Sequence, residues 1–480
     1  MNSTARQELS SLGAEARAKV EQARARAGDA PMLVGFDANG IQAMLSASSR
    51  PIAMSGASAL LLAFDEAQYG RPETVFAGGG RGLMVVKAEE ADGVRADLVC
   101  AFREQTHGGV LATAAVPLRA PDASLALLRL RMGIAKDAAP PPEEDDLQAS
   151  DDACPDCRVR PRTTTIRRGD DAYESCARCA AFVRAGQEAR KDKRSLVMSL
   201  EDIEEGGQVA FVSADGNELG RFFASLSTLE ALVAGSRAVA AIIGAAHEAG
   251  LDAVGSDDDG RVIPLVTGGD DIRVLLPPSK VRAYLEAALP EVERLAASAS
   301  DLDGVLDDRQ AGLLADLKLG AGVLVAPHHF PARRLLEGVH ELEAAAKRRC
   351  RESGGSTSAI GFRYLTTGDA LSGEASDRFP WTPILWSSWP RRVAVARALG
   401  QVPRSQVGAT LQPKAVASEP EATNHFRYQV ARTRAWRSFV DEAAGAEDAW
   451  RDPERCRPDI VDQTTLDLFR LLEREERPSR

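Results

Sequence analysis

The stretch of sequence that decides the fold is Val262-Ile263-Pro264-Leu265-Val266-Thr267-Gly268-Gly269-Asp270-Asp271-Ile272-Arg273-Val274-Leu275-Leu276. Two apolar runs flank a turn that holds two glycines and two adjacent carboxylates, which is the pattern of a β-hairpin with an acidic tip. Hard carboxylate oxygens on a rigid turn suit Mg²⁺, which is usually completed by water and substrate phosphates. An ordinary acidic turn has the same composition, because Gly and Asp favour turns for backbone reasons alone. The rest of the chain has to decide between these two interpretations.

A third acid stands at the end of an earlier predicted strand. Phe211-Val212-Ser213-Ala214-Asp215-Gly216-Asn217 closes a strand with an acid and a glycine. In a β-α-β-β unit the end of the first strand and the tip of the following hairpin are neighbours on one sheet, so we expect Asp215 beside Asp270 and Asp271. Carboxylates gathered in this way raise each other's pKa values unless a cation neutralises them. The pattern therefore favours a divalent metal that binds together with nucleotide phosphates.

Lys347 lies near the end of a helix that is predicted to begin near Pro331. A lysine at this place could reach a phosphate as a point charge. Taken alone, the position favours a surface lysine that interacts with the C-terminal end of its helix. The helix has an inward apolar face formed by Leu335, Leu336, Val339, Leu342 and Ala346.

The bulk composition is that of a soluble globular protein with more than one domain. The chain has 480 residues, of which 44% are hydrophobic and 27% charged, and its net charge is −11. We find no run of ~18 uncharged apolar residues and no signal-peptide pattern at the N-terminus, so we expect a cytoplasmic protein. The negative charge argues against a general nucleic-acid coat protein. Residues 391–440 nevertheless carry nine Lys or Arg against two Glu, with Phe426, Tyr428 and Trp436 among them, so this stretch either contacts RNA or packs on the rest of the protein.

The predicted elements follow the order β-α-β-β-α-β twice, which is the ferredoxin-like arrangement. We therefore expect an α+β protein with two ferredoxin-like palm domains, a zinc-ribbon insert and a C-terminal helical domain. The expected boundaries are an N-terminal helix at 1–30, a first palm at 31–137, a linker at 138–150, a zinc-binding insert at 151–182, a second palm at 183–370 and helices at 371–480.

Four cysteines in the insert have the spacing of a metal site. Two Cys-x₂-Cys pairs are separated by 18 residues, and two such turns can close tetrahedrally around Zn²⁺. A redox role is less favoured, because nothing around them resembles a thioredoxin βαβ unit. We predict a structural zinc held by Cys154, Cys157, Cys176 and Cys179.

Several motifs occur in an order that resembles a known family. They are Asp215-Gly216-Asn217-Glu218-Leu219-Gly220, Gly268-Gly269-Asp270-Asp271, Gly322-Val323-Leu324-Val325-Ala326-Pro327-His328 and Ala346-Lys347. This set resembles the second palm of the large polymerase/cyclase subunit of type III CRISPR effector complexes, which is similar to GGDEF-type nucleotidyl cyclases. The first half resembles the first palm of that subunit through residues 35–42, 55–58 and 77–80. The resemblance covers roughly residues 31–370.

The chain departs from the family pattern in two respects. The family often has an acid where this chain has Asn217, which removes one negative charge beside the metals. None of the six histidines is followed by Asp, so the His-Asp dyad of the family's nuclease domain is missing and we expect no nuclease activity. The first palm has Gly78-Gly79-Gly80 in place of an acidic turn, so it should cradle nucleotide without doing chemistry.

The resemblance implies a nucleotidyl transferase that makes cyclic oligoadenylate or a cyclic dinucleotide from ATP, as a second messenger in antiviral defence. Asp215, Asp270 and Asp271 would be catalytic and, with the Gly216 carbonyl, would hold Mg²⁺ or Mn²⁺. Nucleotide contacts would come from Gly216, Asn217, Gly268, Gly269 and Lys347.

Two other interpretations stay open from the sequence. The chain could be a non-catalytic scaffold subunit of an RNA-guided complex, with RNA or other subunits as partners. It could instead be a stand-alone cyclase that works without guide RNA. The oligomeric state, the base preference and the activating signal are not specified by the sequence.

Overall fold

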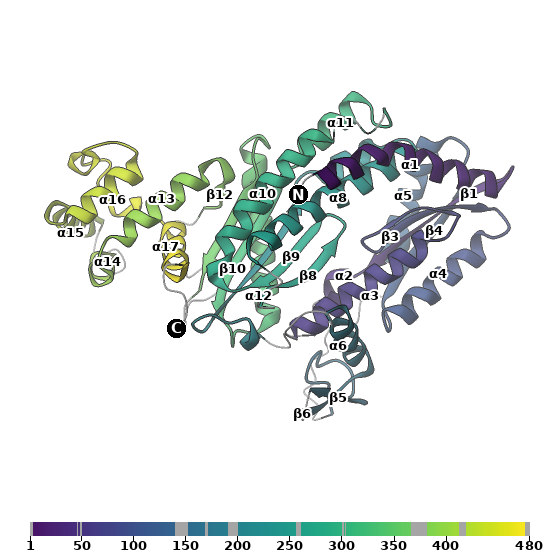
Figure 1. The fold of residues 1–480 in the computed structure, drawn as a ribbon, viewed down its shortest axis with the longest axis horizontal. Coiled ribbons are helices and arrows are strands. Elements are labelled where there is room, and N and C mark those ends of the chain that lie inside the picture. The colour runs from purple at the N-terminus through teal and green to yellow at the C-terminus, as the bar shows by residue number, and fades with distance from the viewer. Residues whose placement is uncertain are drawn as a thin grey trace.

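The computed structural model describes residues 3–45, 47–48, 50–139, 152–168, 171–190, 200–255, 261–299, 302, 304–365, 382–411 and 419–475. The molecule is elongated, with the first palm, the second palm and the C-terminal helices in a row and the cysteine-bearing insert beside the first palm (Figure 1). The α+β fold class, with two palms, an insert and a helical C-terminal part, is confirmed. Residues 140–150 of the predicted linker lie outside the described residues.

The first palm is a four-stranded antiparallel sheet in the order β2-β3-β1-β4. Helices α3 and α4 cover one face, where Val34 and Phe36 of β1 belong to their core, and α1 and α5 cover the other face. A helix at α5 was not foreseen from the sequence. The elements are α1 (Ser3–Ala27), β1 (Pro31–Asn39), α2 (Ile41–Leu45), α3 (Pro51–Tyr69), β2 (Thr74–Gly78), β3 (Arg81–Lys87), α4 (Ala91–Gln105), β4 (Val110–Pro117) and α5 (Pro121–Ala138).

The second palm repeats this topology and extends it. Its sheet has the order β12-β11-β10-β7-β9-β8, so β8-β9-β7-β10 matches β2-β3-β1-β4 of the first palm. Strand β11 runs parallel to β10, and neither β11 nor β12 was foreseen from the sequence. The strands are β7 (Gln208–Gly216), β8 (Ile263–Gly268), β9 (Asp271–Leu276), β10 (Leu319–Pro327), β11 (Ala359–Tyr364) and β12 (Ile384–Leu385), and the helices are α7 (Leu219–Ser225), α8 (Leu229–Ala253), α10 (Val281–Ser298), α11 (Asp308–Ala315) and α12 (Ala332–Glu352).

Helix α8 is a core helix, although its length and composition alone would allow it to cross a membrane. It packs between α1 and α10, and its apolar residues join one large cluster with the inner face of the second sheet. The same cluster contains Leu12 and Val20 of α1 and Leu33 and Val85 of the first palm. Helix α1 therefore joins the two palms through a shared core.

The opposite face of the second sheet is covered by α12, which lies unusually close to the strands. A Cβ atom at Gly322 would lie 2.2 Å from the carbonyl oxygen of Val339, and one at Gly361 would lie 2.3 Å from that of Leu342. Only glycine lets two backbones approach in this way. The glycines of β10 and β11 thus set the height of α12 above the sheet.

We predict that Gly322→Ala destabilises the second palm. The added methyl group meets backbone atoms of α12, which cannot rotate away, so the helix must shift. Overpacking of this kind usually costs about 1–3 kcal/mol, and it should appear as a lower midpoint of urea unfolding. Gly312→Ala on α11 is the matched control, because a Cβ there meets nothing within 4 Å. Equal midpoints for the two variants would contradict this account of α12.

The insert consists of a two-stranded ribbon and a helix that docks on the first palm. The elements are β5 (Thr164–Arg168), β6 (Asp171–Ser175) and α6 (Ala177–Ala189). Helix α6 crosses α3 at a pair of glycines: a Cβ at Gly56 would lie 1.8 Å from the Phe182 carbonyl oxygen, and one at Gly186 2.0 Å from that of Ile52. The predicted end of the insert, residue 182, lies inside α6.

The C-terminal helices pack on one another and on the second palm through α17. They are α13 (Trp389–Gly400), α14 (Arg404–Leu411), α15 (Glu419–Arg432), α16 (Arg434–Ala444) and α17 (Gln463–Glu475). Phe426 and Trp436 are fully buried here, and Arg392 and Arg404 form ion pairs with Asp462 and Glu473 at 2.7 and 2.6 Å. These contacts favour packing over RNA contact for the two aromatic side chains and for these two arginines of the basic stretch.

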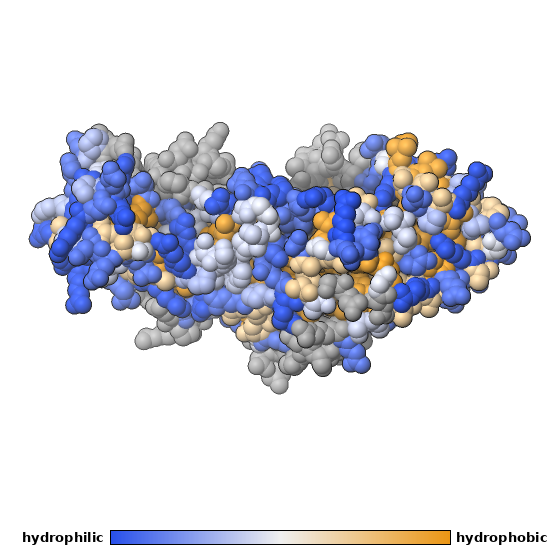
Figure 2. All heavy atoms as spheres, turned by 90° about the horizontal axis from the view of Figure 1, so that it is seen from above, coloured by the Kyte–Doolittle hydropathy of each residue, from blue (hydrophilic) through white to orange (hydrophobic). Residues whose placement is uncertain are grey.

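Large apolar side chains are also exposed on the outer side of α5. Leu130 and Ile134 are each more than 60% exposed. Figure 2 shows apolar surface gathered toward the end of the molecule that the first palm forms.

Candidate functional site

The structure brings Asp215 and Asp271 together as the sequence predicts. In the antiparallel register of β7 and β9, Asp215 is the direct partner of Asp271, which places their Cα atoms about 5 Å apart. Asp270 occupies the turn immediately before Asp271. The three acids thus come from two adjacent strands and one turn, well inside the ~10 Å that a pair of metal ions could bridge.

The backbone geometry of the two hairpin turns explains why the turn of the second palm holds an acid and that of the first palm does not. In the hairpin turn of the second palm Gly269 has a positive φ, of 70°, and Asp270 does not, as in a type II′ turn, whose second central position accepts Asp. In the first palm both Gly79 and Gly80 have positive φ values, of 63° and 75°, as in a type I′ turn, which requires glycine-like residues at both positions. The two tips meet, because a Cβ at Gly79 would lie 3.8 Å from the Cα atom of Gly269.

Burial and mutual repulsion disfavour the charged forms of these acids. Burial and the carboxylate of Asp271 together raise the pKa of Asp215 to about 7, although the Lys347 ammonium opposes the rise. Burial also raises the pKa of Asp271, although the Arg273 guanidinium opposes this. Such strained carboxylates are typical of functional sites and cost stability in the absence of a cation.

Lys347 is not a surface residue, and its ammonium contacts the Asp215 carboxylate. It also lies 3.4 Å from Glu343, one helical turn earlier on α12, and Glu343 accepts a hydrogen bond of 2.6 Å from the Ser213 hydroxyl. Burial alone would lower the pKa of Lys347, but the carboxylates of Asp215 and Glu343 outweigh it and raise the pKa. A chain of four polar groups therefore runs along one face of β7 beneath α12.

Asn217 has a different environment from the acids. Its side chain is buried, and its amide donates to the Cys350 sulfur at 3.2 Å and accepts from Arg351 at 3.3 Å. Asn217 therefore ties the end of β7 to the end of α12. Its proposed contact with nucleotide would have to use the same amide group.

The first palm contains a neutralised copy of the same arrangement. Strand register equates Asp37 with Asp215 and Arg81 with Asp271, since Asp37 pairs with Arg81 across β1 and β3. Asp37 lies 2.6 Å from Lys136 of α5 and 3.4 Å from Arg81. Lys136 and Arg81 thus neutralise the charge of Asp37, so that this acid requires no metal ion.

The glycine turn of the first palm is held from within by Asp65 of α3. The Gly80 N–H donates to the Asp65 carboxylate at 3.0 Å. Burial raises the pKa of Asp65 to about 7, against the opposing effect of hydrogen bonds from Gly80 and Gly79. The amides of this turn are therefore engaged by Asp65 of the same palm, and the turn itself contains no acid.

The four predicted zinc ligands converge. The sulfur atoms of Cys154, Cys157, Cys176 and Cys179 all lie within 4.8 Å of one another. A tetrahedral site with Zn–S bonds of about 2.3 Å requires sulfur atoms about 3.8 Å apart, and Cys157 Sγ lies 3.8 Å from Cys176 Sγ. The cluster could therefore bind zinc. Across the described part of the chain no other group of three or more His, Cys, Asp or Glu is as tight, so the palm acids are spread more widely than these sulfurs.

The insert is locked to the first palm next to these cysteines. Asp156, inside the first Cys-x₂-Cys turn, pairs with Arg50 at 2.6 Å and accepts from Ser175 at 2.9 Å. The Arg50 guanidinium also lies over the ring of Tyr173, 4.1 Å from its centroid. The first Cys-x₂-Cys turn is thereby held against the start of α3.

Two residues of the palm site were missed in the sequence. Glu343 and Lys347 have the i, i+4 spacing of neighbours on a helix, which could have pointed to Glu343. Arg273 follows Asp271 by two residues and so shares its face of β9. Its guanidinium lies 3.7 Å from the Asp271 carboxylate.

The donor set of the second palm fits Mg²⁺. It offers hard carboxylate oxygens, held on strands, in a place where their charged forms are destabilised by burial. Magnesium prefers such oxygens and usually takes only one or two carboxylates from the protein. The donor chemistry of this site is therefore compatible with the predicted metal.

Comparison with known proteins gives a match at the level of structure alone. No protein-family model matches the chain, and no curated protein does. The chain is similar to the Csm1–Csm4 cassette in complex with cA4, with a TM-score of 0.50 and 12% identity over 98% of this chain and 72% of that one. Csm1 from T. onnurineus aligns with a TM-score of 0.49 and 14% identity over 92% of this chain and 70% of that one. The first of these likenesses establishes that the chain has a Csm1-like fold.

Proposed function

We propose that this protein is a metal-dependent nucleotidyl transferase that joins nucleoside triphosphates into a cyclic oligonucleotide. The observation that carries the proposal is the register that sets Asp215 opposite Asp271, beside the turn that holds Asp270. A divalent cation and a nucleotide triphosphate would together relieve the unfavourable charge of these acids. ATP is the substrate that the family resemblance implies, and cyclic oligoadenylate or a cyclic dinucleotide would be the product.

Asp215, Asp270 and Asp271, with the carbonyl of Gly216, would hold Mg²⁺ or Mn²⁺. When bound, the metal supplies charge stabilisation on the phosphates and a lowered pKa for the attacking ribose hydroxyl. Gly269 lets the backbone of the turn approach a phosphate closely. Most of the rate enhancement would come from positioning and electrostatics, as in phosphoryl transfer generally.

Lys347 would exchange partners when substrate binds. Its ammonium neutralises Asp215 in the structure. A phosphate bound beside the acids would be a second anion within its reach. Glu343 keeps the ammonium within reach of both, and Ser213 fixes the orientation of Glu343. Lys347 is thus proposed to offset charge on the phosphates.

The chemistry is assigned to the second palm alone. Asp37 in the first palm already has Lys136 and Arg81 as counter-ions, so it has no need of a metal. The first palm would contribute the opposite wall of the nucleotide site, because its glycine turn abuts that of the second palm.

The biological setting that we infer is antiviral defence of the type III CRISPR kind, in the cytoplasm. The Csm1-like fold supports a role as a large subunit, and the similar cassette contains Csm4 and cA4. A Csm4-like partner and a role for RNA are part of this proposal. The four cysteines would hold a structural zinc.

One observation favours a second candidate, a non-catalytic scaffold subunit. The contact between Lys347 and Asp215 neutralises Asp215 without metal. In a scaffold this ion pair would be permanent, and nucleotide would not displace it.

The test is incubation of the purified protein with labelled ATP or GTP and Mg²⁺ or Mn²⁺, with and without RNA. We expect a cyclic product and pyrophosphate. Product in the absence of RNA would indicate a stand-alone enzyme, and product only with RNA would indicate a complex subunit. No product under any of these conditions would favour the scaffold.

A further inference from the structure

Helix α3 of the first palm contacts both the cysteine-bearing insert and the second palm. On one side it meets α6 of the insert, where the two backbones approach closely at Gly56. On another side it contacts β8, the first strand of the hairpin that carries Asp270 and Asp271. The helix therefore touches both the insert and the strand pair that holds the palm acids.

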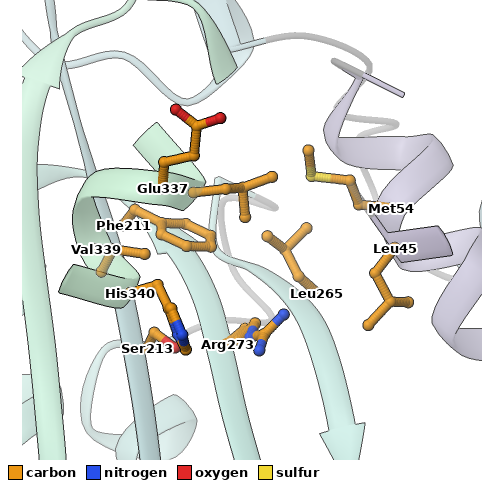
Figure 3. Close-up of a pocket in the computed structure, with 10 residues that line it drawn as sticks. Leu45, Met54, Phe211, Ser213, Leu265, Arg273, Glu337, Val339 and His340 are labelled. Carbon is orange, nitrogen blue, oxygen red and sulfur yellow. The ribbon is translucent and has the colours of Figure 1, made fainter. Parts of the chain in front are cut away.

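Met54, in the first turn of α3, forms part of the wall of a cavity between the two palms. The cavity has a volume of about 190 Å³ and also contains Arg273, which lies two residues beyond Asp271 on β9. The buried Met54 side chain extends from α3 toward the second palm (Figure 3) and belongs to one apolar cluster with Phe211 and Leu265. A displacement of Met54 would therefore change the wall that the first palm contributes beside the acids.

Arg50, the residue before α3, joins Met54 to the insert. Its carbonyl oxygen accepts a hydrogen bond of 3.1 Å from the Met54 N–H, in the first turn of the helix. Its guanidinium pairs with Asp156 at 2.6 Å and lies over the ring of Tyr173, 4.1 Å from the centroid. One residue thus contacts the insert with its side chain and the first turn of α3 with its backbone.

Asp156 in turn is a close neighbour of the cysteine sulfurs. It lies in the turn that begins with Cys154, and its side chain is only 2% exposed. It accepts a hydrogen bond of 2.9 Å from the Ser175 hydroxyl, which lies 3.3 Å from Cys154 Sγ. Groups placed in this way orient the metal ligands, and their mutation typically changes metal affinity by about 10- to 100-fold. A short chain of contacts therefore runs from the sulfurs through Asp156 and Arg50 to Met54.

We propose that Arg50 is a positioning residue through which the insert sets the wall that the first palm contributes to the nucleotide site. This inference rests on the proposed function. When metal is bound, the four cysteines hold the first Cys-x₂-Cys turn in one conformation, and Asp156 holds Arg50 against it. Without metal the turn loses this constraint, so that Arg50 and Met54 can move relative to the second palm. Because coupling between two sites is reciprocal, metal and nucleotide should each bind more tightly in the presence of the other.

Removal of the metal from the wild-type protein should weaken nucleotide binding by roughly 5- to 150-fold, the range that is usual for coupled sites. The measurement is the affinity for a non-hydrolysable ATP analogue at saturating Mg²⁺, before and after treatment with a zinc-selective chelator. Addition of zinc should restore the affinity. Hydrogen exchange at the Met54 amide, whose acceptor is the Arg50 carbonyl, should become faster when the metal is removed.

Arg50→Met interrupts the chain of contacts in its middle. It should lower zinc affinity by about 10- to 100-fold, measured by competition with a chelator, and should lower nucleotide affinity by the same factor as metal removal does. In this variant metal removal should have no further effect on nucleotide affinity, because the two sites are no longer connected. Arg50→Lys keeps the charge but loses the planar guanidinium, so it should recover part of both affinities.

Two further variants serve as controls. Arg71→Met removes an ion pair of 2.8 Å just beyond the other end of α3, and the exposure of Arg71, 32%, is close to the 29% of Arg50. This variant should change neither affinity. Met54→Ala interrupts the chain on the side of the second palm, so it should weaken nucleotide binding and leave zinc affinity unchanged.

Two results would overturn the inference. The first is an unchanged nucleotide affinity after metal removal from the wild-type protein. The second is an Arg50→Met variant that still loses nucleotide affinity on metal removal by the wild-type factor, because the insert would then act by another route or through general destabilisation.

Binding and turnover together distinguish this inference from the proposed function. Nucleotide binding that depends on the metal of the insert, without turnover, would support the inference and reject the catalytic proposal. Turnover that is independent of this metal would reject only the inference. Absence of nucleotide binding in every state would reject both.

Discussion

Replacing Asp271 with asparagine should reduce product formation at least about 1,000-fold, since removing a metal ligand forfeits several kcal/mol of transition-state charge stabilisation. Asparagine keeps the shape of the side chain and loses the charge that would bind metal. Asp215→Asn should have a similar effect, because the two residues are direct partners across β7 and β9. The measurement is the rate of product formation from labelled nucleotide at saturating Mg²⁺.

The same substitutions should not lower the thermal stability of the metal-free protein. The pKa of Asp215 is raised to about 7 in the folded protein, and the pKa of Asp271 is also raised. A carboxyl group whose pKa is higher in the folded than in the unfolded state releases its proton at a cost to the folded state, so the charged form is destabilising above the folded-state pKa. Removing the charge at pH 8 should therefore leave the melting temperature unchanged or raise it.

The combination of lost activity and retained stability separates an enzyme from a scaffold. Residues of a functional site often lower stability while they support activity. In a scaffold the same substitutions would not change activity. Asp252→Asn, at an exposed position on α8, is the control and should change neither property. Product formation by Asp271→Asn at the wild-type rate would refute the proposed metal site.

The second large effect is expected from loss of the cysteine cluster. The protein should contain one zinc per chain, and Cys176→Ser should lose it together with the ordered structure of the insert. Structural zinc contributes about 10–16 kcal/mol in zinc-finger peptides, and the three cysteines Cys154, Cys176 and Cys179 form a small cluster of their own with little other core. Elemental analysis and limited proteolysis would measure these two changes.

The matched control is Cys100→Ser, because Cys100 is exposed and distant in sequence from the cluster. This variant should retain zinc and the wild-type pattern of proteolysis. A wild-type protein that binds no zinc after refolding with the metal, or a Cys176→Ser variant that retains it, would show that the cluster is not a zinc site.

Much of the fold was predictable because its signals are local. The hairpin at 262–276 and the two Cys-x₂-Cys turns are short patterns whose geometry depends on neighbouring residues. The helix α6 and the strands β11 and β12 were not foreseen. Strand β12 has only two residues, and α6 contains Gly186, which disfavours a helix locally but allows close packing on α3. Contacts of this kind have no signature within the segment itself.

The candidate site also contains some residues that strand order predicts and others that depend on tertiary packing. Asp215, Asp270 and Asp271 could be assigned from the order of strands, because the β-α-β-β topology decides which strand ends meet. Arg81 and Lys136 of the first palm could not, since their importance depends on the register of β1 with β3 and on the position of α5. Phe426 and Trp436, considered for RNA contact, are buried instead, because burial depends on how the C-terminal helices pack together.

The amino-acid sequence alone determined that acids would follow a glycine turn and that four cysteines would share a site, since turns and strand ends are specified by adjacent residues. Only the tertiary structure decided that Lys347 neutralises Asp215, that Arg273 lies in a cavity and that Met54 of the other palm closes it. These contacts join residues more than a hundred positions apart or lie between two sheets. They depend on how closely α12 approaches the glycines of β10 and on how the two palms meet, which no local pattern encodes.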